Sequence, residues 1–237
     1  MNEIDLALQK LACGDAAYIE FHQRITNTQQ KLLGVRLPDL RRLARDLLGD
    51  DDYKLIKNLV KFSEVKIYER VLLTGLMINY ARLDEATKIH LTREYLRLVD
   101  SWGQIDSTIA RQPSSEAWWD FALECLQSPR ELTVRYGVVW LMKNVNDIEK
   151  LYKVFRALTE VKHTGYYVKM AIAWLYAEVA VKHYQPTLAA LPNLDTWTRR
   201  KALTKMLESR RFTSQQKTEI RALRDVSFAP IVLQSII

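Results

Sequence analysis

The strongest constraint on the fold is a succession of short segments whose apolar residues recur at helical spacing. The segments run from "EIDLALQKLA" near the start to "SQQKTEIRALRD" near the end. Apolar side chains three or four residues apart predict amphipathic helices. The separators are short and contain Asp, Ser, Gly, Pro or Asn, which are typical of turns between helices. Seven glycines and six prolines in 237 residues are too few for a turn-rich all-β protein. We therefore predict an all-α fold.

Several of the predicted helices share a pattern in which a basic residue leads into an apolar run. The segments are "ERVLLTGLMINY", "VRYGVVWLMKNV", "VKMAIAWLYAEV" and "RRKALTKMLESR". Their leading basic residues are Arg70, Arg135, Lys169 and Arg200. These positions lie 65, 34 and 31 residues apart, and the helix that begins near Trp102 fills the gap in the longest interval.

A period of this length, built from two antiparallel helices, is typical of an α-solenoid of HEAT-like helix pairs. We expect a single domain over residues 1–237. It would be curved, with the leading cations forming a basic track on its concave face. The alternative is that helices simply begin with polar residues.

The charge distribution favours a polyanionic partner. Thirty-five Lys and Arg residues oppose 28 Asp and Glu, for a net charge of +7. The excess is concentrated in "VRLPDLRRLARD" and in "TWTRRKALTKMLESRRF", which contains Arg199, Arg200 and Lys201. Any one cluster could be a solvated helix face, but together they favour nucleic acid.

Other classes of site have little support in the sequence. The four histidines are scattered, and no zinc-binding motif, phosphate-binding loop or serine nucleophile elbow occurs. We therefore expect no metal and no organic cofactor. Cys13 and Cys125 lie far apart and are expected to be reduced thiols. The apolar runs are too short to span a bilayer and no signal peptide is evident, so we expect a cytoplasmic monomer.

The stretch "SWGQIDS" places an indole and a carboxylate one helical turn apart. Trp102 and Asp106 would therefore share one helix face. Asp106 lies between Ile105 and Ile109, where an unpaired carboxylate is costly to bury, so it must meet a cation, an N–H donor or a ligand. With Trp174 of a later repeat, the two indoles and the acid could line a concave site for a cation. Ordinary core packing is the alternative for each tryptophan.

The motifs "GVRLPDLRRLARDLL", "SWGQIDS", "LTVRYGVVWLMK" and "YYVKMAIAWLYAEVA" together resemble the AlkD family of bacterial DNA alkylation repair proteins, which are built from HEAT-like repeats. The resemblance extends from about Leu33 into the 200s, with the motifs in the same order. It implies that Trp102 and Trp174 are the substrate-binding indoles and Asp106 is the catalytic acid. It also implies that Arg135 contacts the DNA backbone. The candidate DNA-binding residues are then Arg135, Lys169, Arg199, Arg200 and Lys201.

The resemblance also implies a chemistry. An N3- or N7-alkylated purine is cationic, so its glycosidic bond is weakened, and its loss leaves positive charge on the deoxyribose. Asp106 would stabilise that charge and position the attacking water. Indole faces would hold the cationic nucleotide. Unlike most glycosylases, which extrude the base, members of this family can act from the backbone side without a base-flipping pocket.

Two departures from the family pattern bear on activity. Family members often have a second tryptophan and an acid after the first tryptophan, where this chain has Gly103 and Gln104. Active members grip DNA with the N-terminal helical pair, but here that pair is short and nearly neutral, with Arg24 offset by Asp15 and Glu20.

Three functions are therefore considered. The first is a glycosylase that excises cationic alkylpurines from double-stranded DNA. The second is a DNA-binding repeat protein of the same family with little or no excision. The third is a helical solenoid that binds another protein.

Overall fold

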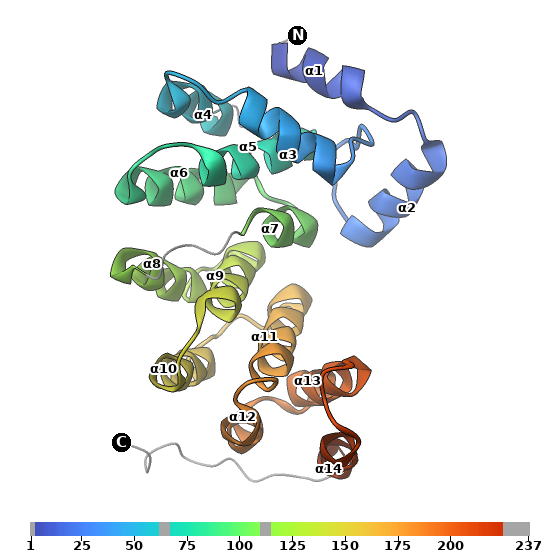
Figure 1. The fold of residues 1–237 in the computed structure, drawn as a ribbon, viewed down its shortest axis with the longest axis vertical. Coiled ribbons are helices and arrows are strands. Elements are labelled where there is room, and N and C mark those ends of the chain that lie inside the picture. The colour runs from blue at the N-terminus through green and yellow to red at the C-terminus, as the bar shows by residue number, and fades with distance from the viewer. Residues whose placement is uncertain (1–2, 62–66, 110–114, 225–237) are drawn as a thin grey trace. The chain divides into compact units, whose positions relative to one another are not determined.

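A computed structural model of the protein describes residues 3–61, 67–109 and 115–224 (Figure 1). Within these ranges it contains fourteen α-helices, one short 3-10 helix (η1) and no strand, so the prediction of an all-α fold is confirmed. The helices of the first half are α1 Glu3–Leu11, α2 Ala16–Thr26, α3 Leu37–Asp46, α4 Asp52–Lys61, α5 Tyr68–Tyr80, α6 Glu85–Leu98 and α7 Trp102–Thr108. Those of the second half are α8 Glu116–Leu126, α9 Glu131–Asn144, α10 Ile148–Thr159, α11 Tyr166–Val179, α12 Tyr184–Ala190, η1 Leu191–Asn193, α13 Thr196–Glu208 and α14 Ser214–Arg224.

The helices group into two compact units. The first contains α1 to α7 and the start of α8 as far as Trp118, and the second contains the rest of α8 and the helices up to α14. Each unit has its own core. The single domain, the curvature and the basic concave face expected from the sequence stay predictions.

Helix α5 is the centre of the first unit. It contacts α1, α3, α4, α6 and α7, and every residue from Tyr68 to Ile78 is buried. Among them is Arg70, the first of the leading cations, whose Nη1 lies 3.1 Å from the Asp5 carboxylate of α1. Arg70 therefore fastens α1 to the core, a role that the repeat pattern did not predict.

A second buried charge of α5 fixes the connection that follows α2. The Glu69 carboxylate accepts hydrogen bonds from the backbone N–H groups of Leu33, at 3.0 Å, and Gly34, at 2.8 Å. Gly34 has a φ of +84°, a backbone conformation that favours glycine. The chain between α2 and α3 is thereby held against α5.

The second unit is built on a row of three of the cation-led helices. Helix α9 packs on α11, α11 packs on α13, and α13 packs on α14. This succession agrees with the repeat phase read from the sequence, because equivalent helices of stacked pairs contact one another. The helical arrangement is consistent with an α-solenoid.

The helix bounds differ from the sequence prediction chiefly around residues 165–193. The sequence pattern "GYYVKMAIAWLYAEVAVKH" predicts one helix over 165–183, but α11 ends at Val179 and α12 begins at Tyr184. Helix α12 was missed because Pro186 reads as a helix breaker. Pro186 is the third residue of the helix, where an N–H group has no intrahelical acceptor, so proline is tolerated. No helix in the described ranges is long and apolar enough to cross a membrane.

Candidate functional site

Helix α7 places Trp102 and Asp106 one turn apart, and both side chains are half-buried. The helix begins after Ser101, whose hydroxyl accepts a hydrogen bond from the N–H of Gly103 at 3.3 Å. The same hydroxyl donates to the Thr26 carbonyl at the end of α2, at 2.8 Å. The N-cap of α7 therefore also fastens α7 to α2.

The indole of Trp102 is attached to the same helix end. Its Nε1–H donates to the Ile25 carbonyl at 2.9 Å. This bond fixes the plane of the ring, because it uses the only donor on the indole. A ligand that meets Trp102 must therefore interact with the ring through its apolar surface.

Gln104 is the buried anchor of α7. Its side-chain amide donates to Gln30 Oε1 at 2.7 Å and to the Tyr68 carbonyl at 3.2 Å. Its own Oε1 accepts from the backbone N–H of Asp100 at 3.1 Å. Gln104 is 0% exposed, and the two hydrogen bonds that its amide donates are buried. They hold the buried side of α7 and leave Trp102 and Asp106 on its partly exposed side.

The close packing of α7 against α5 explains why a glycine occupies position 103 in "SWGQIDS". A Cβ atom added at Gly103 would lie 2.5 Å from the Tyr68 hydroxyl, so a larger residue requires the buried Tyr68 side chain or one of the two helices to shift. Gly103 and Gln104, which stand where family members often have a tryptophan and an acid, are therefore both explained by the packing of α7 in this chain.

Two further hydrogen bonds connect Asp100, just before α7, with the chain that follows α2. The Asp100 carboxylate accepts from the Thr28 hydroxyl at 2.6 Å and from the Gln29 N–H at 3.0 Å. We call residues 25–30 together with 100–104 the α2–α7 junction. No pattern in the sequence predicts this junction, because its partners are polar and lie some 70 residues apart.

In the second unit, Trp174 is half-buried on α11. Its Nε1–H donates to the Glu178 carboxylate at 3.2 Å. Arg211 donates two hydrogen bonds to that carboxylate, at 2.9 and 2.6 Å. The Arg211 hydrogen bonds lower the pKa of Glu178 against the opposing effect of its burial. Arg211 belongs to the basic segment "TWTRRKALTKMLESRRF", but its pairing with Glu178 was not predicted. Glu178 was not singled out from the sequence, although it follows Trp174 by one helical turn.

A pocket of about 330 Å³ opens beside Trp174. It is formed by the end of α9, the second half of α11 and Arg211. Its charged residues are Glu178 and the basic side chains Lys143, Lys182 and Arg211, and His183 also lines it. An indole surrounded by an excess of basic groups is suited to a ligand that combines an aromatic ring with an anionic group.

The predicted DNA-binding cations lie in different environments. Arg135 is 6% exposed, and its Nη1 donates to the Tyr167 carbonyl at the start of α11, at 3.0 Å. Arg199 is 7% exposed, whereas Arg200 and Lys201 on α13 are exposed. Arg135 thus joins α9 to α11, and its contact with DNA stays a prediction.

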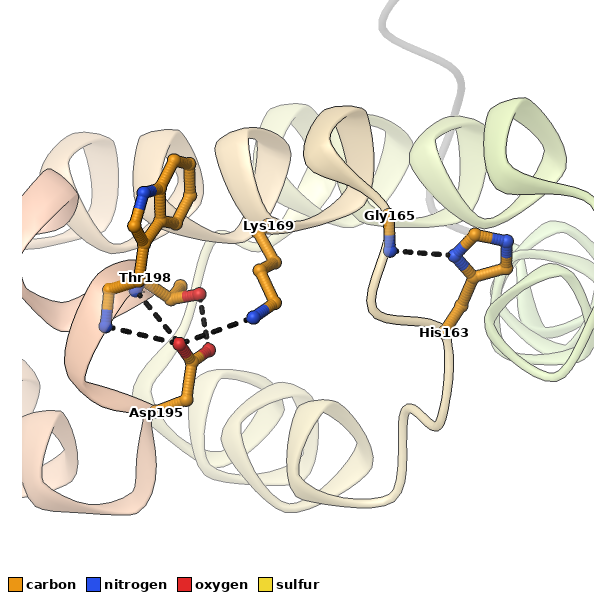
Figure 2. A network of polar contacts seen from close by, with 6 residues as sticks. His163, Gly165, Lys169, Asp195 and Thr198 are labelled. Carbon is orange, nitrogen blue, oxygen red and sulfur yellow. Dashed lines mark hydrogen bonds and ion pairs between the residues drawn. The ribbon is translucent and has the colours of Figure 1, made fainter.

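Lys169 connects α11 to α13 (Figure 2). Its Nζ lies 3.4 Å from the Asp195 carboxylate, which also accepts hydrogen bonds from the Thr198 hydroxyl and N–H, at 2.5 and 3.3 Å. Burial works to raise the pKa of Asp195, but the Thr198 hydrogen bonds and the Lys169 charge outweigh it, so this pKa lies below its ordinary value. Asp195 is therefore an ionised N-cap of α13, and Lys169 is its partner.

The four predicted site residues fall into two pairs. Trp102 and Asp106 belong to the first unit, and Arg135 and Trp174 belong to the second. Their convergence on one surface stays a prediction. Within the described ranges, no group of three or more His, Cys, Asp and Glu side chains is placed to hold a metal ion. Both cysteines are free thiols, with Cys13 exposed and Cys125 buried.

Comparison with known proteins adds one finding to this geometry. A protein-family model described as "DNA alkylation repair enzyme" matches residues 6–206. The match includes both pairs of predicted site residues and ends within α13. No curated protein matches the chain closely enough to count as a relative.

Proposed function

Because the chain belongs to the DNA alkylation repair enzyme family, we propose that it is a DNA N-glycosylase that releases cationic N3- or N7-alkylated purines from double-stranded DNA. Membership of the family gives the chain a role in DNA repair and DNA as its partner. The reaction type, the lesion class and the residues that act are the proposal. The protein would work as a cytoplasmic monomer without a metal or organic cofactor.

The proposed reaction uses the charge already present on the lesion. As the glycosidic bond breaks, its electron pair goes to the cationic purine, which leaves as a neutral base. The deoxyribose becomes positively charged, and the Asp106 carboxylate stabilises it. Water then adds to C1′ and loses a proton to Asp106 or to solvent, which leaves an abasic site. The faces of Trp102 and Trp174 would hold the cationic nucleotide through cation–π contacts.

The observation that best supports this proposal is the anchoring of α7. Electrostatic stabilisation is effective when the charged group is fixed before the reaction, so that little reorganisation is required. Gln104 and Ser101 hold the buried side and the start of α7, while Asp106 and Trp102 remain partly exposed on the same helix. An approach to the sugar from the backbone side would need no pocket for an extruded base.

A second candidate function, DNA binding with little excision, is favoured by the N-terminal helical pair. Two of its carboxylates are paired with cations of the following elements, Asp15 with Arg36 at 3.3 Å and Asp5 with Arg70 at 3.1 Å. The solvent-facing side of helix α2 includes the apolar side chains Phe21 and Ile25, which are 50% and 41% exposed. Such a surface offers few groups for phosphate, so lesion capture would depend on the basic residues of α13.

The test compares base release by the wild type and by Asp106→Asn, using duplex DNA that contains 7-methylguanine. We expect the variant to lose roughly a hundredfold or more in the rate of release, because the charge is removed while the shape is kept. Asp120→Asn on α8 is the matched control, since Asp120 is an exposed aspartate outside α7. Equal release by the wild type and Asp106→Asn would reject the catalytic role.

A salt titration of duplex binding separates the remaining alternatives. Affinity that falls steeply with added salt, without base release, would leave DNA binding as the function. Affinity that is absent or insensitive to salt would favour a protein partner.

A further inference from the structure

Three aromatic side chains gather at the starts of α11 and α13. The rings of Tyr166 and Trp197 lie 5.8 Å apart at an angle of 65°, and those of Tyr166 and Tyr167 lie 5.3 Å apart at 77°. Tyr166 nevertheless remains 59% exposed. Neither neighbour stacks flat on the Tyr166 ring, so a large part of this ring is open to solvent. We call Tyr166, Tyr167 and Trp197 the aromatic cluster.

Basic side chains surround the aromatic cluster. The Lys201 ammonium lies 5.7 Å from the centre of the Trp197 ring, within the range of a cation–π contact. Arg200 is exposed beside Lys201 on α13. Lys169, one turn after Tyr166 on α11, reaches Asp195 at the start of α13, as Figure 2 shows. The cluster is thus held by two helices that an ion pair joins.

The nearby carboxylates are already occupied as helix caps. Asp195 caps α13 through the N–H groups of Trp197 and Thr198. The Glu131 carboxylate accepts a hydrogen bond from the Tyr167 N–H at 2.6 Å and thereby caps α11. The helix N-termini are therefore not the sites for an incoming anion. The exposed cations of α13, Arg200 and Lys201, are available for that role.

We propose that the aromatic cluster binds single-stranded DNA, with one unpaired base stacked on Tyr166 and the adjoining phosphates held by Lys201 and Arg200. Stacking on an exposed aromatic ring beside cations is the common mode of single-strand recognition. A base inside a duplex is already stacked and cannot reach Tyr166. The proposal rests on DNA as the partner in the proposed function, and it does not require base excision or Asp106.

The surroundings favour a nucleic acid over an apolar protein surface. Among the described residues of the second unit, the large exposed hydrophobic side chains are Ile148 on α10 and Tyr166. The aromatic cluster is bordered by the charged side chains Arg200 and Lys201 and not by other large exposed hydrophobic side chains. A protein partner that docks by apolar burial would find little area here.

The test measures the affinity of the full chain for a fluorescent oligothymidylate by anisotropy over a range of salt concentrations. Thymine strands have little secondary structure, so their bases are free to stack. We expect Tyr166→Ala to weaken binding at least about fivefold, because one base–aromatic stack is lost. Tyr166→Phe should bind like the wild type, since it keeps the ring. Tyr53→Ala is the matched control, because Tyr53 on α4 is also exposed and lies beside a lysine, Lys57.

Two results would overturn the proposal. One is a wild type that does not bind the oligothymidylate. The other is a Tyr166→Ala variant that melts at the wild-type temperature and binds as tightly as wild type or as Tyr53→Ala, which would mean that charge alone attracts the strand. The two proposals fail separately. A wild type that does not bind the oligothymidylate rejects this proposal alone, whereas a wild type that binds it but does not release 7-methylguanine rejects excision alone.

Discussion

At the scale of single residues, the candidate catalytic helix depends on two positions that are not themselves candidates for catalysis. Gly103 leaves room for the Tyr68 hydroxyl, and Gln104 uses both ends of its amide on three partners. A buried polar side chain whose hydrogen bonds are all made specifies one orientation of the helix, whereas a partly satisfied one is costly. Asp106 therefore owes its position to its neighbours in the sequence.

We expect Gly103→Ala to lower the free energy of unfolding by about 1 to 3 kcal/mol, because the added methyl group overlaps the Tyr68 hydroxyl. Urea denaturation measures the change. Gly49→Ala is the control, since a Cβ there meets no atom within 4 Å and should change stability by less than about 1 kcal/mol. The loss should be smaller when Gly103→Ala is made in a Tyr68→Phe background. Equal stability of Gly103→Ala and Gly49→Ala would show that the Tyr68 hydroxyl leaves room for a Cβ atom at position 103.

At the scale of helices, the sequence predicted the number and type of elements better than their long-range contacts. Helical spacing predicts helices over 130–145 and 195–209, within one residue of α9 and α13, because an apolar stripe records which face is buried. It missed α12, where a proline in the first turn resembles a breaker. It could not reveal the α2–α7 junction, because hydrogen bonds between residues such as Gln30 and Gln104 leave no periodic pattern.

The candidate site was predictable to a similar extent. The four-residue spacing placed Trp102 and Asp106 on one side of α7, as the helix confirms. The spacing did not predict that Arg135 is buried against the start of α11, or that Trp174 is tied to Glu178. Both depend on the partner helix, which the local sequence does not identify.

The ion pair between Glu178 of α11 and Arg211, which follows α13, predicts a pH dependence. Its hydrogen bonds lower the pKa of the Glu178 carboxyl below the ordinary value of 4.5. A carboxylate whose pKa is lower in the folded protein stabilises the fold at pH values above its ordinary pKa. This stabilisation is lost as the pH falls through the folded-state pKa. We expect Glu178→Gln to be less stable than the wild type at pH 7 by at most about 1 kcal/mol, since the pair is partly exposed.

This difference should shrink as the pH is lowered below the ordinary carboxyl pKa. Urea denaturation of both proteins at a series of pH values measures it. Glu160→Gln, which removes an exposed carboxylate after α10, is the control and should show a smaller difference at pH 7. If the free energies of unfolding of Glu178→Gln and the wild type differ by the same amount down to the lowest pH, the lowered pKa of Glu178 is contradicted.

At the scale of the whole molecule, the proposed function combines an all-helical fold with a reaction that needs little chemical assistance. A net charge of +7 brings the chain to DNA without selecting a lesion. In the proposed function, selection would come from the charge of the damaged base itself, which indoles attract and which makes the base a good leaving group. An enzyme of this kind should therefore discriminate by lesion charge and not by the hydrogen-bonding edge of the base.

The most direct test of this central claim is the single-turnover release of bases from two otherwise identical duplexes, one with 7-methylguanine and one with uracil. We predict release of the cationic base well above the spontaneous rate measured without protein, and release of uracil at background. Release of uracil as fast as 7-methylguanine, or release of 7-methylguanine at only the spontaneous rate, would contradict it.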